Sequence, residues 1–190
     1  MPIRLAALAL LLAATPLHGQ LSPVEQEISR YVRTHVEDGI ELVAGQVRIG
    51  SGTHDLEGVR RMHDLLAPEL RALGFDVRWV PQEHVGRAGH LVAERVDDSA
   101  VGASILLVGH LDTVDEGEGW WERDGLTGRG PGSNDMKGGN AVIVMALRAL
   151  HHAGALEGRT IRVIFTGDEE SVGRPVAEAR AVMTELARQS

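Results

Sequence analysis

The chain has 190 residues, of which 43% are hydrophobic and 24% are charged, a composition typical of a soluble globular domain. Its formal net charge of −8 and the lack of a basic stripe argue against binding to nucleic acid or to an anionic membrane surface. The sequence contains no cysteine, which excludes disulfides and thiolate ligands, so any metal ion would be held by His, Asp and Glu.

Residues 1–19 have the pattern of a secretory signal peptide. Arg4 precedes an unbroken apolar run over residues 5–14, and polar, turn-prone residues follow it. This run is too short to cross a bilayer as a helix, which takes about 20 residues. The alternative is a buried N-terminal helix. We expect export to the periplasm or the cell exterior, with no membrane association after the signal is removed.

The next segments predict helices. Ser22 and Pro23 are typical of a helix start, and the apolar pattern continues to residue 47, with a possible kink on the way. A second helix is predicted over residues 55–73, with Gly74 as its C-terminal cap.

The rest of the chain alternates between strands and helices. Alternating or continuous apolar runs predict strands at residues 75–80, 90–96, 105–108 and 161–165. Helical periodicity predicts helices at residues 136–151 and 176–186. This order predicts an α/β fold with a mostly parallel central sheet flanked by helices, formed as one domain by residues 20–190.

Residues that commonly bind metals follow two of these strands. His110 and Asp112 come after the strand at 105–108, and Glu169 and Glu170 come after the strand at 161–165. Open α/β sheets bind ligands beyond the carboxyl ends of their strands, so we expect both pairs at the same edge.

The His110-x-Asp112 pair has the residue types of a metal-bound imidazole and the carboxylate that orients it. Taken alone, the pair also fits a histidine that is satisfied at a strand end. The other histidines, His90 among them, lie in no comparable pattern.

Asp135 lies in a glycine-rich loop just before a predicted helix. It has two interpretations, as a carboxylate that bridges two cations or as the N-cap of that helix. We expect the neighbouring Lys137 to be solvated or paired with a carboxylate.

The segment Asp168-Glu169-Glu170 is the most specific of the three. Adjacent side chains of an extended segment point to opposite sides, so one glutamate can bind metal while its neighbour faces the attacking water. A solvated acidic turn is the alternative. Considered together, the three segments predict a metal site.

The segments 50–53, 109–114, 132–139 and 166–171 together resemble the M20 family of zinc metallopeptidases and amidohydrolases, in its glutamate carboxypeptidase branch. The resemblance implies that His110 binds one zinc ion and that Asp112 orients it. Asp135 would bridge two zinc ions and precede a cis peptide bond. Glu169 would be the general base, and Glu170 would bind the second zinc ion.

The resemblance implies hydrolysis of a small peptide or an N-acyl amino acid, with zinc, or else cobalt or manganese, in the site. It also implies further ligands, a lid and dimerisation domain and a homodimeric full-length form, and the 190 residues contain neither those ligands nor that domain. The alternative is a catalytically inactive, truncated fragment that binds metal weakly or not at all.

Overall fold

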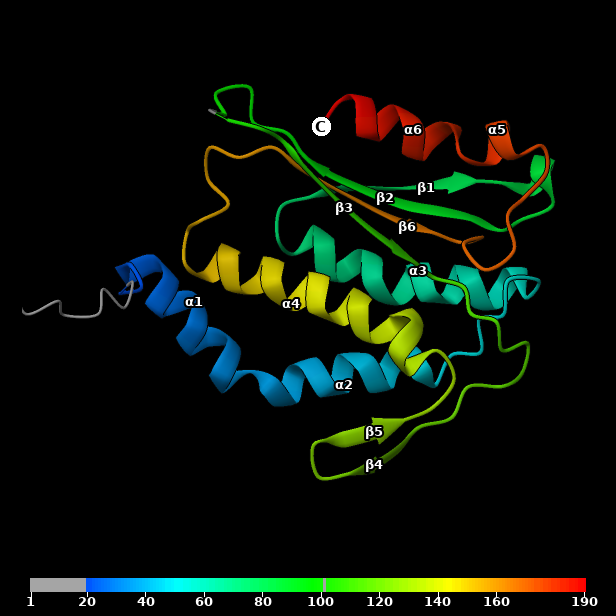
Figure 1. Ribbon diagram of the computed structural model, residues 1–190, viewed down its shortest axis with the longest axis horizontal. Coiled ribbons are helices and arrows are strands. Elements are labelled where there is room, and N and C mark those ends of the chain that lie inside the picture. Colours follow the sequence, from blue (N-terminus) through cyan, green and yellow to red (C-terminus); the bar gives the residue numbers. More distant parts are fainter. Residues whose placement is uncertain (1–19, 101) are drawn as a thin grey trace, which may run out of the picture.

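The computed structural model describes residues 20–100 and 102–190, so the predicted signal peptide lies outside the described residues. Its centre is a four-stranded sheet in the order β1-β2-β6-β3 (Figure 1). The strands are β1 (Asp76–Pro81), β2 (Gly89–Arg95), β3 (Ile105–His110) and β6 (Ile161–Thr166).

The α/β fold class is confirmed, but the sheet is mixed and the prediction of a mostly parallel sheet was wrong. Strands β3 and β6 pair in parallel, whereas β1 with β2 and β2 with β6 pair antiparallel. The reason lies in the short link between β1 and β2, residues 82–88, which includes a 3₁₀ turn at Glu83–Val85. A link of this length allows a hairpin, whereas a parallel crossover needs a dozen or more residues.

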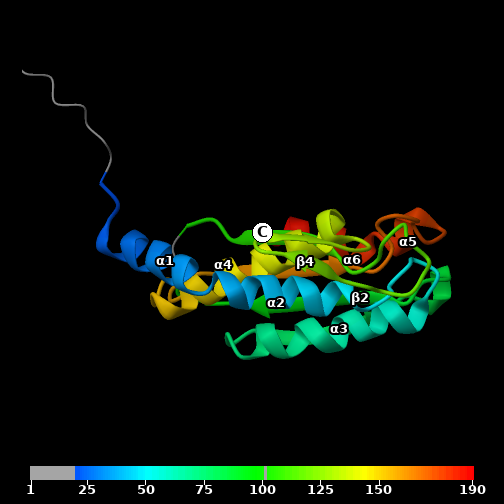
Figure 2. The same ribbon diagram turned by 90° about the horizontal axis from the view of Figure 1, so that it is seen from below.

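Helices cover both faces of the sheet, and Figures 1 and 2 show α3 and α6 on opposite sides of it. The helices are α1 (Pro23–Thr34), α2 (Val36–Val47), α3 (Leu56–Arg71), α4 (Gly138–His152), α5 (Val176–Ala179) and α6 (Ala181–Arg188). Helices α3 and α4 pack on one face, and α1 and α2 lie against α4. The predicted kink in the first helix occurs at His35, and the predicted final helix is divided at Arg180.

Alternate residues of the central strands build two cores. Leu91 and Phe165 pack into the larger core with α3 and α4. Their neighbours Val92 and Ile164 face the other way and pack with Leu186 of α6. Because every residue of β6 is buried, this strand is fixed from both faces, and so is the loop that follows it.

A small hairpin, β4 (Glu122–Asp124) and β5 (Thr127–Arg129), is absent from the predicted elements. It lies beside α2, to which Arg123 is tied by an ion pair with Glu37 (Figure 1). Within residues 20–100 and 102–190, the helices are too short or too polar to cross a membrane.

Candidate metal centre

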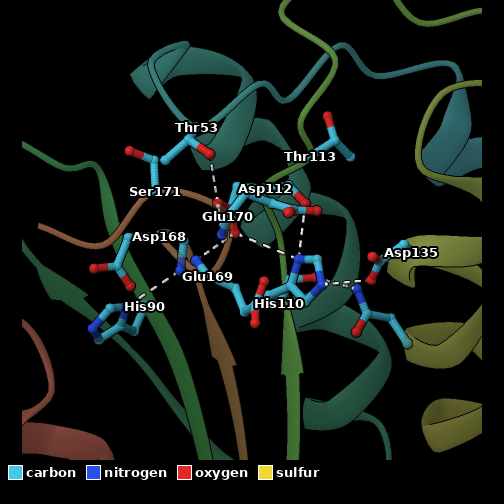
Figure 3. A network of polar contacts seen from close by, with 12 residues as sticks. Thr53, His90, His110, Asp112, Thr113, Asp135, Asp168, Glu169, Glu170 and Ser171 are labelled. Atoms are coloured by element: carbon cyan, nitrogen blue, oxygen red, sulfur yellow. Dashed lines mark hydrogen bonds and ion pairs between the residues drawn. The ribbon is translucent and has the colours of Figure 1, made fainter.

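The parallel pairing of β3 and β6 places two of the predicted segments at one edge of the sheet. His110, the last residue of β3, is paired with Thr166, the last residue of β6. The amide of Leu111 donates a hydrogen bond to the Thr166 carbonyl oxygen over 2.7 Å. The chain therefore leaves both strands at the same point, and the polar side chains that follow gather there (Figure 3).

Three of the predicted ligands come together at this edge. His110, Asp135 and Glu170 each offer one donor atom, and these atoms lie within 4.8 Å of one another. The Nε2 atom of His110 is 3.1 Å from Oδ1 of Asp135. His110 is buried, Glu170 is half-buried and Asp135 is exposed, so the cluster opens outward on the Asp135 side.

The orientation of His110 is fixed through its other ring nitrogen. Nδ1 lies 2.9 Å from the backbone carbonyl oxygen of Asp112 and 3.5 Å from Oδ1 of the same residue. Asp112 therefore contacts the ring as predicted, but through its carbonyl more closely than through its carboxylate. Burial lowers the pKa of His110, yet Asp112 and Asp135 outweigh it and raise the pKa to about 9.

The carboxylate of Asp112 holds the glutamate segment in place. Its Oδ1 accepts from the amide of Glu169 over 3.0 Å, and its Oδ2 accepts from the amide of Glu170 over 3.1 Å. The hydroxyl of Thr53 donates to the same Oδ2 over 2.7 Å. Burial alone would raise the pKa of Asp112, but the hydrogen bonds from His110, Thr53 and the two amides lower it below its usual value.

The two adjacent glutamates have different surroundings, as expected of neighbours in an extended segment. Glu170 belongs to the donor cluster, whereas the exposed Glu169 lines a cavity of about 400 Å³ together with His110, Asp135 and Arg180. Burial raises the pKa of Glu170, and the negative charges of Asp135, Asp112 and Glu169 add to the effect. The glutamate that faces the cavity is thus distinct from the one in the cluster.

Asp135 reaches the cluster from an irregular turn, Ser133–Lys137, at the start of α4. Its backbone is not helical, and the peptide bond to Met136 is cis, as the resemblance implies. The helix begins only at Gly138, and its N-terminus receives no side-chain cap. Asp135 is therefore not the N-cap, and its carboxylate is free to face His110.

Gly132 lets this turn approach the strand end closely. Its φ of 67° is a conformation that side chains disfavour, and a Cβ there would lie 2.3 Å from Cγ2 of Thr113.

Lys137 does not have the predicted solvated position. Its side chain is buried and its Nζ donates to the carbonyl oxygen of Ile49 over 2.7 Å. Burial lowers the pKa of Lys137 to about 8, against the opposing charge of Asp115. The prediction failed because the methylene stem of a lysine can fill an apolar gap while its ammonium group still reaches one carbonyl oxygen.

The donor set fits a divalent ion such as zinc. One imidazole nitrogen and two carboxylates are ligand types that zinc accepts, and ligands about 2.1 Å from a tetrahedral ion lie about 3.4 Å apart. Burial is the main cause of the raised pKa of Glu170, and the neighbouring carboxylates raise it further; a cation would relieve their repulsion.

Comparison with known proteins agrees with this geometry. The sequence model of Peptidase family M20/M25/M40 matches residues 106–189. Carboxypeptidase G2 of Pseudomonas sp. (strain RS-16) is 35% identical over 131 residues, which are 65% of this chain and 30% of that protein. A succinyl-diaminopimelate desuccinylase of Gluconacetobacter diazotrophicus is 38% identical over 116 residues, which are 56% of this chain and 29% of that protein.

Among solved structures, human carnosine dipeptidase 1 shares the fold with a TM-score of 0.68 and 23% sequence identity. That match covers 87% of this chain and 39% of the dipeptidase. The chain thus spans roughly a third of the length of the relatives it matches. With its mixed α/β sheet and the matched segments at the carboxyl edge, the chain is similar to M20 family metallopeptidases and covers only part of their catalytic domains.

Proposed function

We propose that this chain is the N-terminal part of the catalytic domain of an exported zinc-dependent hydrolase that cleaves peptide or amide bonds. The observation that carries the proposal is the convergence of His110, Asp135 and Glu170, with Glu169 on the wall of the adjoining cavity. The names of the relatives support amide bonds as the substrate class, since carboxypeptidases and desuccinylases both cleave them.

In this proposal His110, Asp135 and Glu170 would hold the metal, and Asp135 would serve as a ligand shared by two ions. Zinc would supply Lewis acidity, which polarises the scissile carbonyl group and acidifies water. The ring of His110 presents Nε2 because Nδ1 is engaged by Asp112. Cobalt or manganese would suit the same donors, because ligand type alone does not separate these ions.

Glu169 is the proposed general base. Its carboxylate lines the cavity, whereas its backbone amide is fixed by Asp112. It would take a proton from the attacking water at one carboxylate oxygen and deliver it to the nitrogen of the leaving amine. Glu169 needs no metal bond for this role, which agrees with its place outside the donor cluster.

The proposed substrates are small peptides and N-acyl amino acids, with carboxypeptidase-type cleavage as the more specific form of the proposal. The names of the two relatives, a carboxypeptidase and a desuccinylase, support this choice. We also propose that the complete protein is a homodimer.

The test is zinc-dependent hydrolysis of dipeptides and N-acyl amino acids by the protein in the longest form that its gene encodes. Glu169→Gln is expected to lower kcat by about 10²- to 10⁴-fold, the usual contribution of a general base, while zinc stays bound. Glu178→Gln, which alters an exposed glutamate of α5, is the matched control and should keep full activity. Full activity in Glu169→Gln would contradict the assignment, and zinc binding without any turnover would favour the inactive fragment.

A further inference from the structure

Asp168 has a role that its place in an acidic run does not indicate. Its side chain is fully buried, so the alternative of a solvated acidic turn is wrong at this position. Arg180 donates from Nη1 to Oδ1 of Asp168 over 2.5 Å and from Nη2 to the backbone carbonyl oxygen of Asp168 over 3.2 Å. The amide of Gly173 donates to Oδ2 over 2.9 Å. The buried charge therefore has a counter-charge and closes the turn that follows the two glutamates.

A second connection runs beside this ion pair. His90 of β2 is buried, and its Nδ1 accepts from the amide of Gly167 over 3.2 Å. Its Nε2 donates to the carbonyl oxygen of Ala179 over 3.2 Å. The residue before Asp168 and the residue before Arg180 are thus joined through one imidazole, and the junction of α5 and α6 is fastened to the end of β6.

The glutamates lie between this junction and Asp112. Asp112 accepts hydrogen bonds from the amides of Glu169 and Glu170, while Arg180 donates a hydrogen bond to Asp168, the residue before them. Within residues 20–100 and 102–190, no hydrogen bond to either glutamate carboxylate is found, so the hydrogen bonds that hold the two residues are those of their backbone. Figure 3 shows Glu169 and Glu170 between Asp168 on one side and His110 on the other.

We propose that Arg180 is a positioning residue of the metal site, acting through Asp168. By holding Asp168 at two atoms, it fixes the backbone from which Glu169 enters the cavity and Glu170 enters the donor cluster. Its side chain also lines the cavity, but the guanidinium group is engaged with Asp168 and so acts on the substrate only indirectly. The consequence for hydrolysis rests on the proposed function, whereas the effect on the backbone does not.

Arginine suits this position because its planar group donates in two directions at once, here to a carboxylate and to a carbonyl of the same residue. Lysine would keep the charge but presents a single ammonium group. Arg180→Lys should therefore keep part of the hold on Asp168, whereas an uncharged side chain of similar size should not. This difference separates positioning from simple space filling.

The experiment measures hydrogen–deuterium exchange on the metal-free chain for three variants. Arg180→Met should accelerate exchange of the amides of Glu169, Glu170 and Gly173 by about tenfold or more, as expected when a local opening becomes easier. Arg180→Lys should restore part of the protection. Arg188→Met, which removes an exposed arginine of α6 whose side chain is 73% accessible, is the matched control and should change nothing.

Zinc affinity, measured by chelator competition, gives the second readout. Arg180→Met should weaken zinc binding because Glu170 loses its fixed place, and Arg188→Met should not. Unchanged exchange in residues 167–173, or uniform acceleration through β2 and β6 as well, would overturn the proposal. If Arg180→Met does not fold, the test uses Arg180→Lys instead, and its amide exchange in residues 167–173 is compared with that of the wild type. If the wild-type chain binds no zinc while Arg180→Met still shows faster local exchange, the proposed function is contradicted and the positioning role stays intact.

Discussion

The acidic residues of the site fall into an inner and an outer group. The inner group, Asp112 and Asp168, is buried and accepts hydrogen bonds from the protein on both carboxylate oxygens. The outer group, Asp135, Glu169 and Glu170, is exposed or half-buried, and among the described residues only Asp135 has a hydrogen-bond contact to its carboxylate, from His110. Carboxylates that are saturated by the protein build the site, and those left open are available to a metal ion and to a substrate.

The contrast occurs even between neighbours in sequence. Asp168, Glu169 and Glu170 are consecutive, yet the first is fully buried and the second is exposed. The partners of Asp168 come from the turn after the glutamates and from Arg180, so its charge is compensated inside the protein. Charge alone therefore does not assign a role to an acidic residue in such a run.

Removal of an inner carboxylate should produce the largest change. Asp112→Ala leaves the amides of Glu169 and Glu170 and the hydroxyl of Thr53 without their acceptor, so it should lower the free energy of unfolding by about 3 kcal/mol. Glu169→Ala removes an exposed side chain and should change it by less than about 0.5 kcal/mol. Urea unfolding of the metal-free chain measures both values. Equal losses would break the distinction between the two groups.

A pH titration tests how strongly Asp112 of the inner group and Asp135 of the outer group stabilise the charged form of His110. Its pKa in the fold, about 9, lies above the ordinary value of 6.5. The stabilisation is therefore fully present below about pH 6.5 and is lost as the pH rises through about 9, with a total of about 3 kcal/mol. The measurement compares unfolding of the metal-free wild type with His110→Gln at pH 6 and pH 10. A difference between the two proteins that stays constant with pH would contradict this account.

Zinc affinity should depend on pH in the opposite sense to the stability of the metal-free chain. The metal requires a neutral imidazole, so zinc affinity should increase as the pH rises towards the pKa of His110.

The smallest expected effect concerns the hydroxyl that supports Asp112. Thr53→Val removes one buried hydrogen bond of 2.7 Å and should cost about 1 kcal/mol of unfolding free energy. Thr184→Val, at an exposed position of α6, is the matched control and should be close to neutral. A neutral Thr53→Val variant would indicate that Asp112 is held well enough by the two amides.

The sequence was sufficient to place the outer residues and Asp112. Apolar runs that predict strands end near His110 and before Glu169, and parallel pairing of those strands puts their ends together. The proposed role of Asp135 came from the resemblance to the family. Only the structure shows that Asp135 is not the N-cap of α4, because that helix begins at Gly138.

The supporting residues could not be found in the same way. Thr53 lies 59 positions before Asp112, and His90 lies 89 positions before Ala179, and no local pattern links such pairs. The direction of β2 was missed because periodicity identifies a strand but carries no information on which neighbour it pairs with or in which sense. Lys137 was missed since a buried lysine and a solvated one look alike in sequence.

The most direct test of the central claim is a zinc titration of the metal-stripped chain, carried out in parallel on Glu169→Gln and Glu170→Gln. These substitutions change neighbouring residues identically, and only Glu170 belongs to the donor cluster. The account predicts that Glu169→Gln binds zinc as the wild type does, and that Glu170→Gln loses more than about tenfold in affinity, or about 1.4 kcal/mol. Equal affinities in the two variants, or a larger loss in Glu169→Gln, would contradict it.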